Sequence, residues 1–278
     1  MTTALNRLRL LARQAGHQAA PASAREPAPS VTASVDSSAL RALLRIRHRQ
    51  ITPLRSEDRE LPGVELVPGL RLTEVRQPTP DVPALLDGSF ARREAIPTAQ
   101  ALFFDTETTG LAGGVGTRAF MIGASDWVDG QLRVRQLTIT TTGAEPAMLE
   151  AFRSWLRPDT LLVSYNGRSY DAPLLAGRFR LARMGAPLQG IDHLDLLYPT
   201  RRRYKDRWEN CRLATIERNA LGIVREDDLP GSEAPAAWLS YLRGGSASVL
   251  RGVLRHNHQD VVTLAALLLH LDLQANLT

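Results

Sequence analysis

The sharpest signal in this 278-residue sequence is the stretch Phe103-Phe104-Asp105-Thr106-Glu107-Thr108-Thr109-Gly110. An apolar run leads directly into Asp105, which is typical of a short buried strand. Residues two apart on a strand face the same way, so the carboxylates of Asp105 and Glu107 project together. Two such carboxylates repel each other unless a cation neutralises both, and oxygen ligands of this kind suit Mg²⁺ or Mn²⁺. We therefore expect a metal-binding pair at this strand end; two solvated surface acids are the alternative.

Two further acids stand at equally suggestive positions. Asp171 lies between a predicted strand and a predicted helix, where it serves either as a metal ligand or as the cap of that helix. Asp260 follows His256 by one helical turn, so both side chains lie on one face of the helix. That spacing suits a metal ligand beside a general base, although it also fits a surface pair. His258 points away from this face, and we expect it to lie outside the site.

The pattern around these acids predicts an α/β fold with a mixed sheet flanked by helices. Strands are expected at 101–105, 119–128, 132–142 and 160–165, with Asp129-Gly130 as a hairpin turn. Helices are expected at 145–156, 172–184, 192–198, 211–221, 234–243 and 246–273. The predicted domain therefore runs from 99 to 273.

The residues before this domain look different. Residues 1–60 are basic and predict a flexible extension, largely disordered or helical, with a transit-peptide-like helix at 1–13 as the less favoured reading. Residues 61–98 carry frequent Pro and Gly between short extended runs, which indicates an irregular arm. The single cysteine, Cys211, excludes an internal disulfide and a multi-thiolate zinc site. No apolar run is long enough to span a membrane, and we expect a cytoplasmic protein.

The charge balance points to an anionic partner. Lys and Arg number 34 against 29 Asp and Glu, which gives a net charge of +5 and a pI near 9.9. Basic side chains bind nucleic acid because each neutralised phosphate releases counterions. One basic stretch also contains aromatics, which suits a phosphate track with base stacking, and a solvated loop is the alternative. Its candidate contacts are Arg201, Arg202, Arg203, Tyr204 and Trp208.

The three acidic motifs, taken in order, resemble those of the DEDD exonuclease superfamily, which has a ribonuclease H-like fold. The surrounding sequence resembles the YprB-type ribonuclease H-like domain family of bacterial proteins, over about residues 61–272. The stretches that carry this second resemblance are Leu111–Thr117, Asp195–Tyr198, Leu229–Ser232, Pro235–Trp238 and His256–Val261. Asp195 belongs to a shared stretch, but we interpret it as a structural or helix-start residue.

The resemblance implies a 3′–5′ exonuclease on single-stranded DNA or RNA that uses two Mg²⁺ or Mn²⁺ ions. It implies that the ions are bound by Asp105, Glu107, Asp171 and Asp260. His256 falls at the position of the general base, yet it stands three residues from Asp260 where the histidine subclass usually has four. A non-catalytic nucleic-acid-binding module of the same fold, or an endonuclease on RNA–DNA hybrids, are the alternatives.

Three smaller expectations complete the picture. Thr108 and Asn166, which lie within the first two motifs, are candidate substrate contacts. The glycines of Gly114-x-Gly116-x-x-Ala119 formally match a dinucleotide fingerprint. That motif needs a strand before it and a helix opening within it, whereas here a predicted strand follows. We therefore expect these glycines to form a tight turn beside the acidic site.

Overall fold

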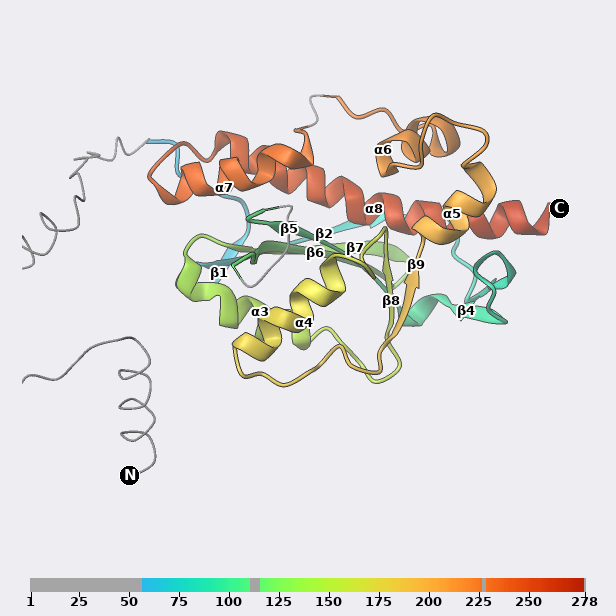
Figure 1. Cartoon of the computed structure of the whole chain (residues 1–278), viewed down its shortest axis with the longest axis horizontal. Coiled ribbons are helices and arrows are strands. Elements are labelled where there is room, and N and C mark those ends of the chain that lie inside the picture. Colours follow the sequence, from blue (N-terminus) through green and yellow to red (C-terminus); the bar gives the residue numbers. More distant parts are fainter. Residues whose placement is uncertain (1–56, 111–115, 227–228, 278) are drawn as a thin grey trace, which may run out of the picture. The chain divides into compact units, whose positions relative to one another are not determined.

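A seven-stranded mixed sheet forms the centre of the protein in this computed structural model, which describes residues 57–110, 116–226 and 229–277 (Figure 1). Its order is β1-β2-β7-β6-β5-β8-β9. The strands β8 and β9 run parallel to β5, and the other neighbours are antiparallel. The strands of this sheet are β1 (Val64–Val67), β2 (Leu70–Pro78), β5 (Ala101–Thr108), β6 (Ala119–Val128), β7 (Gln131–Ile139), β8 (Leu161–Ser164) and β9 (Asp192–Asp195).

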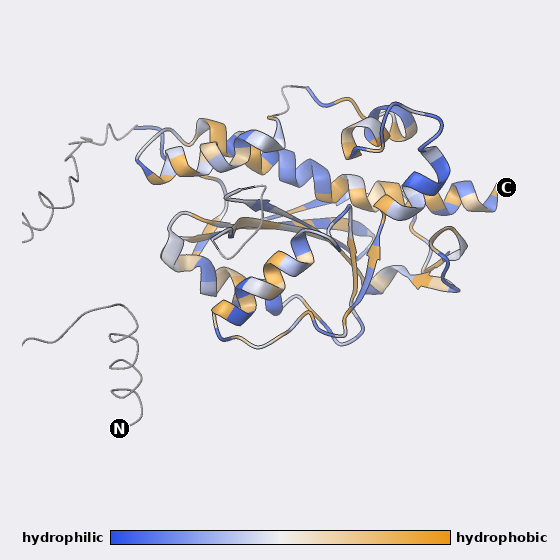
Figure 2. Cartoon of the chain, viewed as in Figure 1, coloured by the Kyte–Doolittle hydropathy of each residue, from blue (hydrophilic) through white to orange (hydrophobic). Residues whose placement is uncertain are grey.

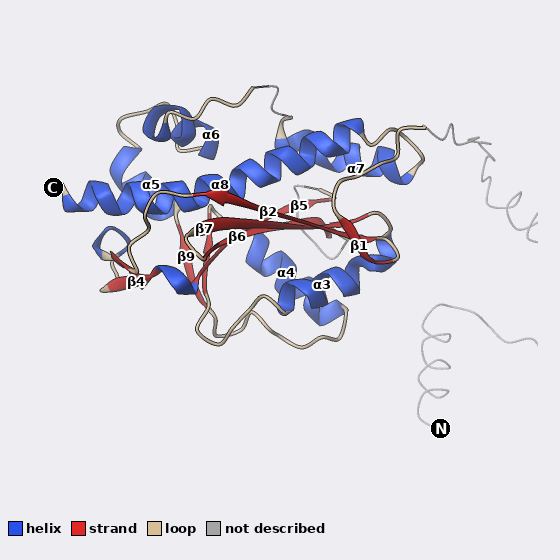
Figure 3. Ribbon diagram, turned by 180° about the vertical axis from the view of Figure 1, so that it is seen from behind, coloured by secondary structure: helices blue, strands red, loops and turns tan. Residues whose placement is uncertain are grey.

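Helices cover both faces of this sheet. Figures 1 and 3 both show α3 (Glu145–Arg153) and α4 (Asp171–Leu181) on one face. The other face carries α7 (Ala234–Leu242) and the long helix α8 (Ser248–Asn276). The predicted mixed sheet flanked by helices is thereby confirmed. The remaining elements are β3 (Leu85–Asp87), β4 (Ala95–Pro97), α5 (Leu197–Tyr204), α6 (Leu213–Ile216), four 3₁₀ turns (Ser89–Ala91, Thr98–Gln100, Thr142–Ala144 and Gly231–Glu233) and a π-helical segment (Glu217–Leu221).

Alternation along β5 divides its side chains between the two layers. Phe104 is buried towards α3, where its ring lies 6.1 Å from that of Phe152. Phe103 faces the other way and packs in the apolar cluster that contains Val261 and Leu268 of α8. Burying one such side chain contributes about 1.5–3 kcal/mol. Because Asp105 and Glu107 continue the Phe103 face, their carboxylates lie beneath α8.

The middle of α8 is polar where it crosses this face. In Figure 2 a hydrophilic block interrupts the apolar colouring of the helix, and the residues responsible are Arg255–Asp260. A helix that packs on a sheet normally presents apolar residues to it. The block therefore marks the position at which helix packing gives way to a polar site. Across the described residues, no helix combines the length and hydropathy needed to cross a membrane.

Two local predictions were wrong because strand pairing is not local. Residues 192–195 form the strand β9 and not the start of a helix, since their backbone pairs in parallel with β8. Residues 61–98 are not an arm outside the domain. Their strand β2 pairs along its whole length with β7, from Leu70 opposite Ile139 to Pro78 opposite Gln131. In both cases the partner strand lies far away in the sequence, so a local pattern cannot report it.

The predicted hairpin between β6 and β7 forms as expected. Asp129 and Gly130 have φ angles of 52° and 71°, the left-handed pair that a tight two-residue turn requires. Glycine adopts this conformation without strain, and aspartate tolerates it. The expectations for residues 1–56 and for the glycines at 113 and 114 lie outside the described residues.

Candidate acidic site between β5 and α8

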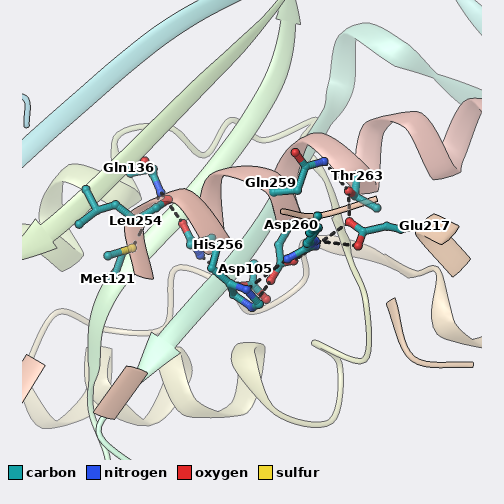
Figure 4. Close-up of polar contacts among 11 residues, drawn as sticks. Asp105, Met121, Gln136, Glu217, Leu254, His256, Gln259, Asp260 and Thr263 are labelled. Atoms are coloured by element: carbon teal, nitrogen blue, oxygen red, sulfur yellow. Dashed lines mark hydrogen bonds and ion pairs between the residues drawn. The ribbon is translucent and has the colours of Figure 1, made fainter. Parts of the chain in front are cut away.

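The end of β5 and the middle of α8 bring acidic side chains and a histidine together. Glu107, which is 7% exposed, meets His256 and Asp260, and one ligand atom from each lies within 4.8 Å of the others. Figure 4 shows Asp105 gathered with His256 and Asp260 in the same place. These residues come from segments about 150 positions apart. The fold therefore joins the first and third sequence motifs into one site.

Asp105 is held in place by an amide that the sequence analysis did not assign. The Nδ2 group of Asn257 donates to Asp105 Oδ2 at 3.0 Å. Asn257 is fully buried, and its Oδ1 accepts from Gln136 Nε2 at 3.0 Å. Gln136 Nε2 also donates to the Leu254 carbonyl at 2.8 Å (Figure 4). Since Gln136 presents a donor, the amide of Asn257 must turn its oxygen to Gln136 and its NH₂ to Asp105.

Asp171 reaches the site region from the opposite layer. Thr106 faces α4 because it alternates with Asp105 on β5, and its hydroxyl donates to Asp171 Oδ1. Asp171 opens α4, but within the part of the chain that the structure describes no side chain caps that helix. Gly167 lies so close that a Cβ there would be 3.1 Å from Asp171 Oδ2. The carboxylate is thus directed to the strand end and not to its own helix.

An open cavity of about 460 Å³ lies beside these acids. Its lining includes both Asp105 and Asp171. Of the candidate substrate contacts, Thr108 and Asn166 also line it. The ring of Tyr170, which is 63% exposed, stands at its edge. The second sequence motif therefore forms a wall of the same cavity as the first.

The carboxylates destabilise one another in the absence of a cation. Burial, followed by the negative charges of Asp260, Asp171 and Glu107, raises the pKa of Asp105 well above its ordinary value. Burial also raises the pKa values of Asp171 and Asp260. Hard divalent cations prefer carboxylate oxygens of this kind, and a bound cation would remove the repulsion. The donor set therefore fits Mg²⁺ or Mn²⁺.

Arg225 is the main residue of the site that sequence reasoning missed. Its Nη2 donates to Asp260 Oδ1 at 2.5 Å and to Glu217 Oε1 at 2.5 Å, and its Nε donates to Glu217 Oε2 at 2.7 Å. Its Nη1 lies 3.2 Å from His256 Nδ1. Burial alone would lower the pKa of Arg225, but the bonds and charges of Glu217 and Asp260 outweigh it and raise that pKa. Arg225 stands in a loop without a motif, so no local signal marks it.

Asp195 has a structural role, as its sequence position suggested. Its carboxylate accepts backbone N–H bonds from Asn166 at 2.7 Å, Arg168 at 3.1 Å and Leu197 at 3.0 Å. The first two bonds fix the turn after β8, in which Asn166 has a φ of 66°. Asp195 therefore shapes the cavity wall from behind.

The basic stretch at 201–208 is mostly helix α5 and not a loop, and it does not line the cavity beside the acids. Tyr204 is 3% exposed, stacks on Trp208 at 4.3 Å and bonds His270 through its hydroxyl at 2.7 Å. Arg202 and Arg203 bond the Phe90 carbonyl and Gln274. Arg201 is exposed. The Tyr204 ring is thus used inside the protein, and Arg201 is the member of this stretch best placed for a phosphate.

We expect Gly123→Ala to disturb the site through Asn257. Gly123 is paired with Asp105 across β5 and β6, and a Cβ there would lie 2.0 Å from Asn257 Oδ1. Overpacking a buried position costs about 1–3 kcal/mol. Thermal unfolding should show a Tm lower by about 2–12 °C. In an Asn257→Ala background the same change should cost little, because the clashing amide is gone; an equal loss in both backgrounds would contradict this account.

Comparisons with known proteins agree with this architecture. Residues 102–272 match the model of the RNase H superfamily. The uncharacterized protein YprB of Bacillus subtilis (strain 168) is 38% identical over 171 residues, or 61% of this chain, and the chain spans 41% of that relative. Among solved structures, the family B DNA polymerase of the archaeon Pyrobaculum calidifontis is 15% identical with a TM-score of 0.46, over 62% of this chain and 24% of that one. E. coli Exonuclease I in complex with a dT13 oligonucleotide is 18% identical with a TM-score of 0.38, over 56% and 43%. From the family match and the YprB relationship, the chain belongs to the RNase H superfamily as a YprB-type ribonuclease H-like protein.

Proposed function

We propose that this protein is a divalent-metal-dependent nuclease, and that it removes nucleotides from the 3′ end of single-stranded DNA or RNA. The observation that carries the proposal is the meeting of Asp105 and Glu107 on β5 with Asp260 on α8. Membership of the RNase H superfamily supports a phosphodiesterase chemistry. The 3′–5′ direction rests on the resemblance of the motifs to DEDD exonucleases.

Four carboxylates would hold the metal ions, namely Asp105, Glu107, Asp171 and Asp260. Two Mg²⁺ or Mn²⁺ ions supply activation of water and stabilisation of the leaving oxygen in this class of chemistry. Asp260 offers Oδ2 to a cation, because Arg225 already binds its Oδ1. Asp105 is oriented by the Asn257 amide at Oδ2, which fixes the direction of the whole carboxylate.

The cavity beside the acids would receive the end of the nucleic acid. Its volume of about 460 Å³ lies within the range of small-ligand sites, about 300–1,000 Å³. Tyr170 offers an exposed ring on which a base could stack, while Thr108 and Asn166 offer polar atoms. These features support a single-stranded substrate, because a base must be unpaired to stack on a protein ring.

A direct assay tests the proposal. The purified chain is incubated with 5′-labelled single-stranded DNA and RNA in Mg²⁺, Mn²⁺ or EDTA, with Asp105→Asn as the matched control. We expect a metal-dependent ladder that shortens from the 3′ end and is absent in the variant. Cleavage of circular single strands would indicate an endonuclease instead. Intact strands that still bind the protein would replace the proposal with the non-catalytic nucleic-acid-binding module.

We expect Arg201→Glu to weaken binding of a single-stranded oligonucleotide and to flatten its salt dependence. Each phosphate contact that is lost lowers the slope of log K against log salt by about 0.7. Arg153→Glu on α3 is a suitable control, since Arg153 is also exposed and its ion pair with Glu150 contributes little. Fluorescence anisotropy at several salt concentrations measures the slope. An unchanged slope in Arg201→Glu would remove α5 from the proposed substrate path.

A further inference from the structure

The contact between Arg225 and His256 decides which ring nitrogen carries the proton. Arg225 Nη1 lies 3.2 Å from His256 Nδ1. A guanidinium has only donors, so Nδ1 must be the acceptor in this hydrogen bond. A neutral histidine carries one ring proton, which is then on Nε2. Turning the ring over would place a carbon against Arg225 and lose the bond.

Arg225 is itself held firmly in this orientation. Glu217, which is 1% exposed, accepts from both Nε and Nη2 of Arg225, and Asp260 accepts from Nη2 as well. Thr263 of α8 donates to Glu217 and ties this pair to the helix (Figure 4). Bidentate ion pairs of this kind fix the plane of the guanidinium. The donor that faces His256 is therefore built into the fold.

The Nε2 atom of His256 faces the acidic site. It lies 3.4 Å from Asp260 Oδ2, and one ligand atom of Glu107 lies within 4.8 Å of the ring. Gly231, in the Leu229–Ser232 stretch noted in the sequence, comes close on another side. A Cβ at Gly231 would stand 3.5 Å from Nε2, so the glycine leaves this atom uncovered. An Nε2–H group is thus directed to the place where a phosphate would meet the carboxylates.

We propose that Arg225 is a positioning residue that fixes His256 as the Nε2–H tautomer, so that His256 donates a hydrogen bond to a phosphate oxygen of bound nucleic acid. A nitrogen that already carries a proton has no in-plane lone pair with which to take a proton from water or to bind a cation. His256 is then neither the general base expected from the motif nor a metal ligand. This inference rests on the proposed function for the identity of the bound phosphate.

The tautomer is measured directly by NMR. Long-range ¹H–¹⁵N spectra of protein labelled on its six histidines are recorded with and without Mg²⁺. A pH of about 8 keeps the ring neutral, because an ordinary histidine pKa is about 6.5. His256→Gln identifies the His256 signals by their absence. We expect a protonated Nε2 and an unprotonated Nδ1. The reverse tautomer in the wild-type protein, in either condition, overturns the proposal.

Two substitutions at position 256 separate a donor from a base. Gln places its NH₂ near the position of Nε2, whereas Asn reaches only to the position of Nδ1, and neither amide can act as a base. Loss of a donor to the transition state lowers turnover by about 10²–10³-fold. We expect that loss for His256→Asn and a much smaller one for His256→Gln. Equal losses in the two variants overturn the donor role.

Binding to an uncleaved strand provides the readout that does not need turnover. In an Asp105→Asn background, His256→Asn should weaken oligonucleotide affinity more than His256→Gln does. The same order of affinities with a wild-type protein that cleaves nothing would sink the nuclease proposal and keep this one. Equal affinities of the two variants would sink the phosphate contact, whatever the nuclease assay gives.

Discussion

Asp105→Asn is expected to abolish metal-dependent turnover and to remove the stabilisation that Mg²⁺ gives the wild-type protein. A ligand present at 100 times its Kd stabilises the folded state by about 2.7 kcal/mol. For a domain of this size that corresponds to a Tm higher by about 5–11 °C. The variant should show no such rise, because Asp105 contributes to the same charge cluster as Glu107, Asp171 and Asp260. Differential scanning calorimetry with Mg²⁺ or EDTA measures both proteins.

In EDTA the order of stability should reverse, with the variant more stable than the wild-type protein. Burial and three neighbouring carboxylates raise the pKa of Asp105, so the metal-free folded state loses stability as the pH rises above the ordinary carboxyl range. Asn removes that charge and still offers an oxygen to the Asn257 amide. Asp126→Asn on β6 is the control, since Asp126 is paired with Arg133 and Arg135 outside the site. A full Mg²⁺ response in Asp105→Asn would contradict the proposed metal site.

Glu217→Ala is expected to cause the largest loss of stability among single changes near the site. The carboxylate is 1% exposed and accepts two hydrogen bonds from Arg225 and one from Thr263. Removing one member of a buried ion pair costs about 3–5 kcal/mol, because the other charge stays buried without its partner. Thermal unfolding in Mg²⁺ should show a Tm lower by about 6–20 °C.

The double variant Glu217→Ala/Arg225→Met is the control for that argument. Replacing both members of a buried ion pair by apolar groups is often close to neutral. The double variant should therefore be more stable than Glu217→Ala alone, with Mg²⁺ present in both measurements to offset the loss of the Arg225 charge beside Asp260. A double variant that is no more stable than the single one would show that the stranded charge is not the cause.

Local sequence patterns were sufficient for the elements that build the centre of the fold. The apolar run into Asp105 predicted β5, and its period of two placed Asp105 and Glu107 on one face. Asp129-Gly130 predicted the hairpin because few other residue pairs adopt two left-handed conformations in a row. The long apolar pattern of α8 was visible with His256 and Asp260 one turn apart. These features depend on a few neighbouring residues, so the sequence contains them in readable form.

Elements at the sheet margins could not be predicted in the same way. β9 has the polar sequence Asp192-His193-Leu194-Asp195, and only its pairing with β8 makes it a strand. β2 was visible as an extended run, but its place in the main sheet depends on β7, which begins more than 50 residues later. The energy that decides these cases comes from backbone pairing between distant segments.

By itself the sequence determined the fold class, the strand that carries Asp105 and Glu107, and the helical spacing of His256 and Asp260. Tertiary structure alone decided that Asn257 and Gln136 orient Asp105, and that Glu217 holds Arg225 against Asp260 and His256. The physical reason is directionality. A periodic pattern tells which face of an element a side chain occupies, but a hydrogen bond depends on which donor from another element arrives opposite it. His256 illustrates the difference, since its position was readable and its protonated nitrogen is set by an arginine 31 residues away.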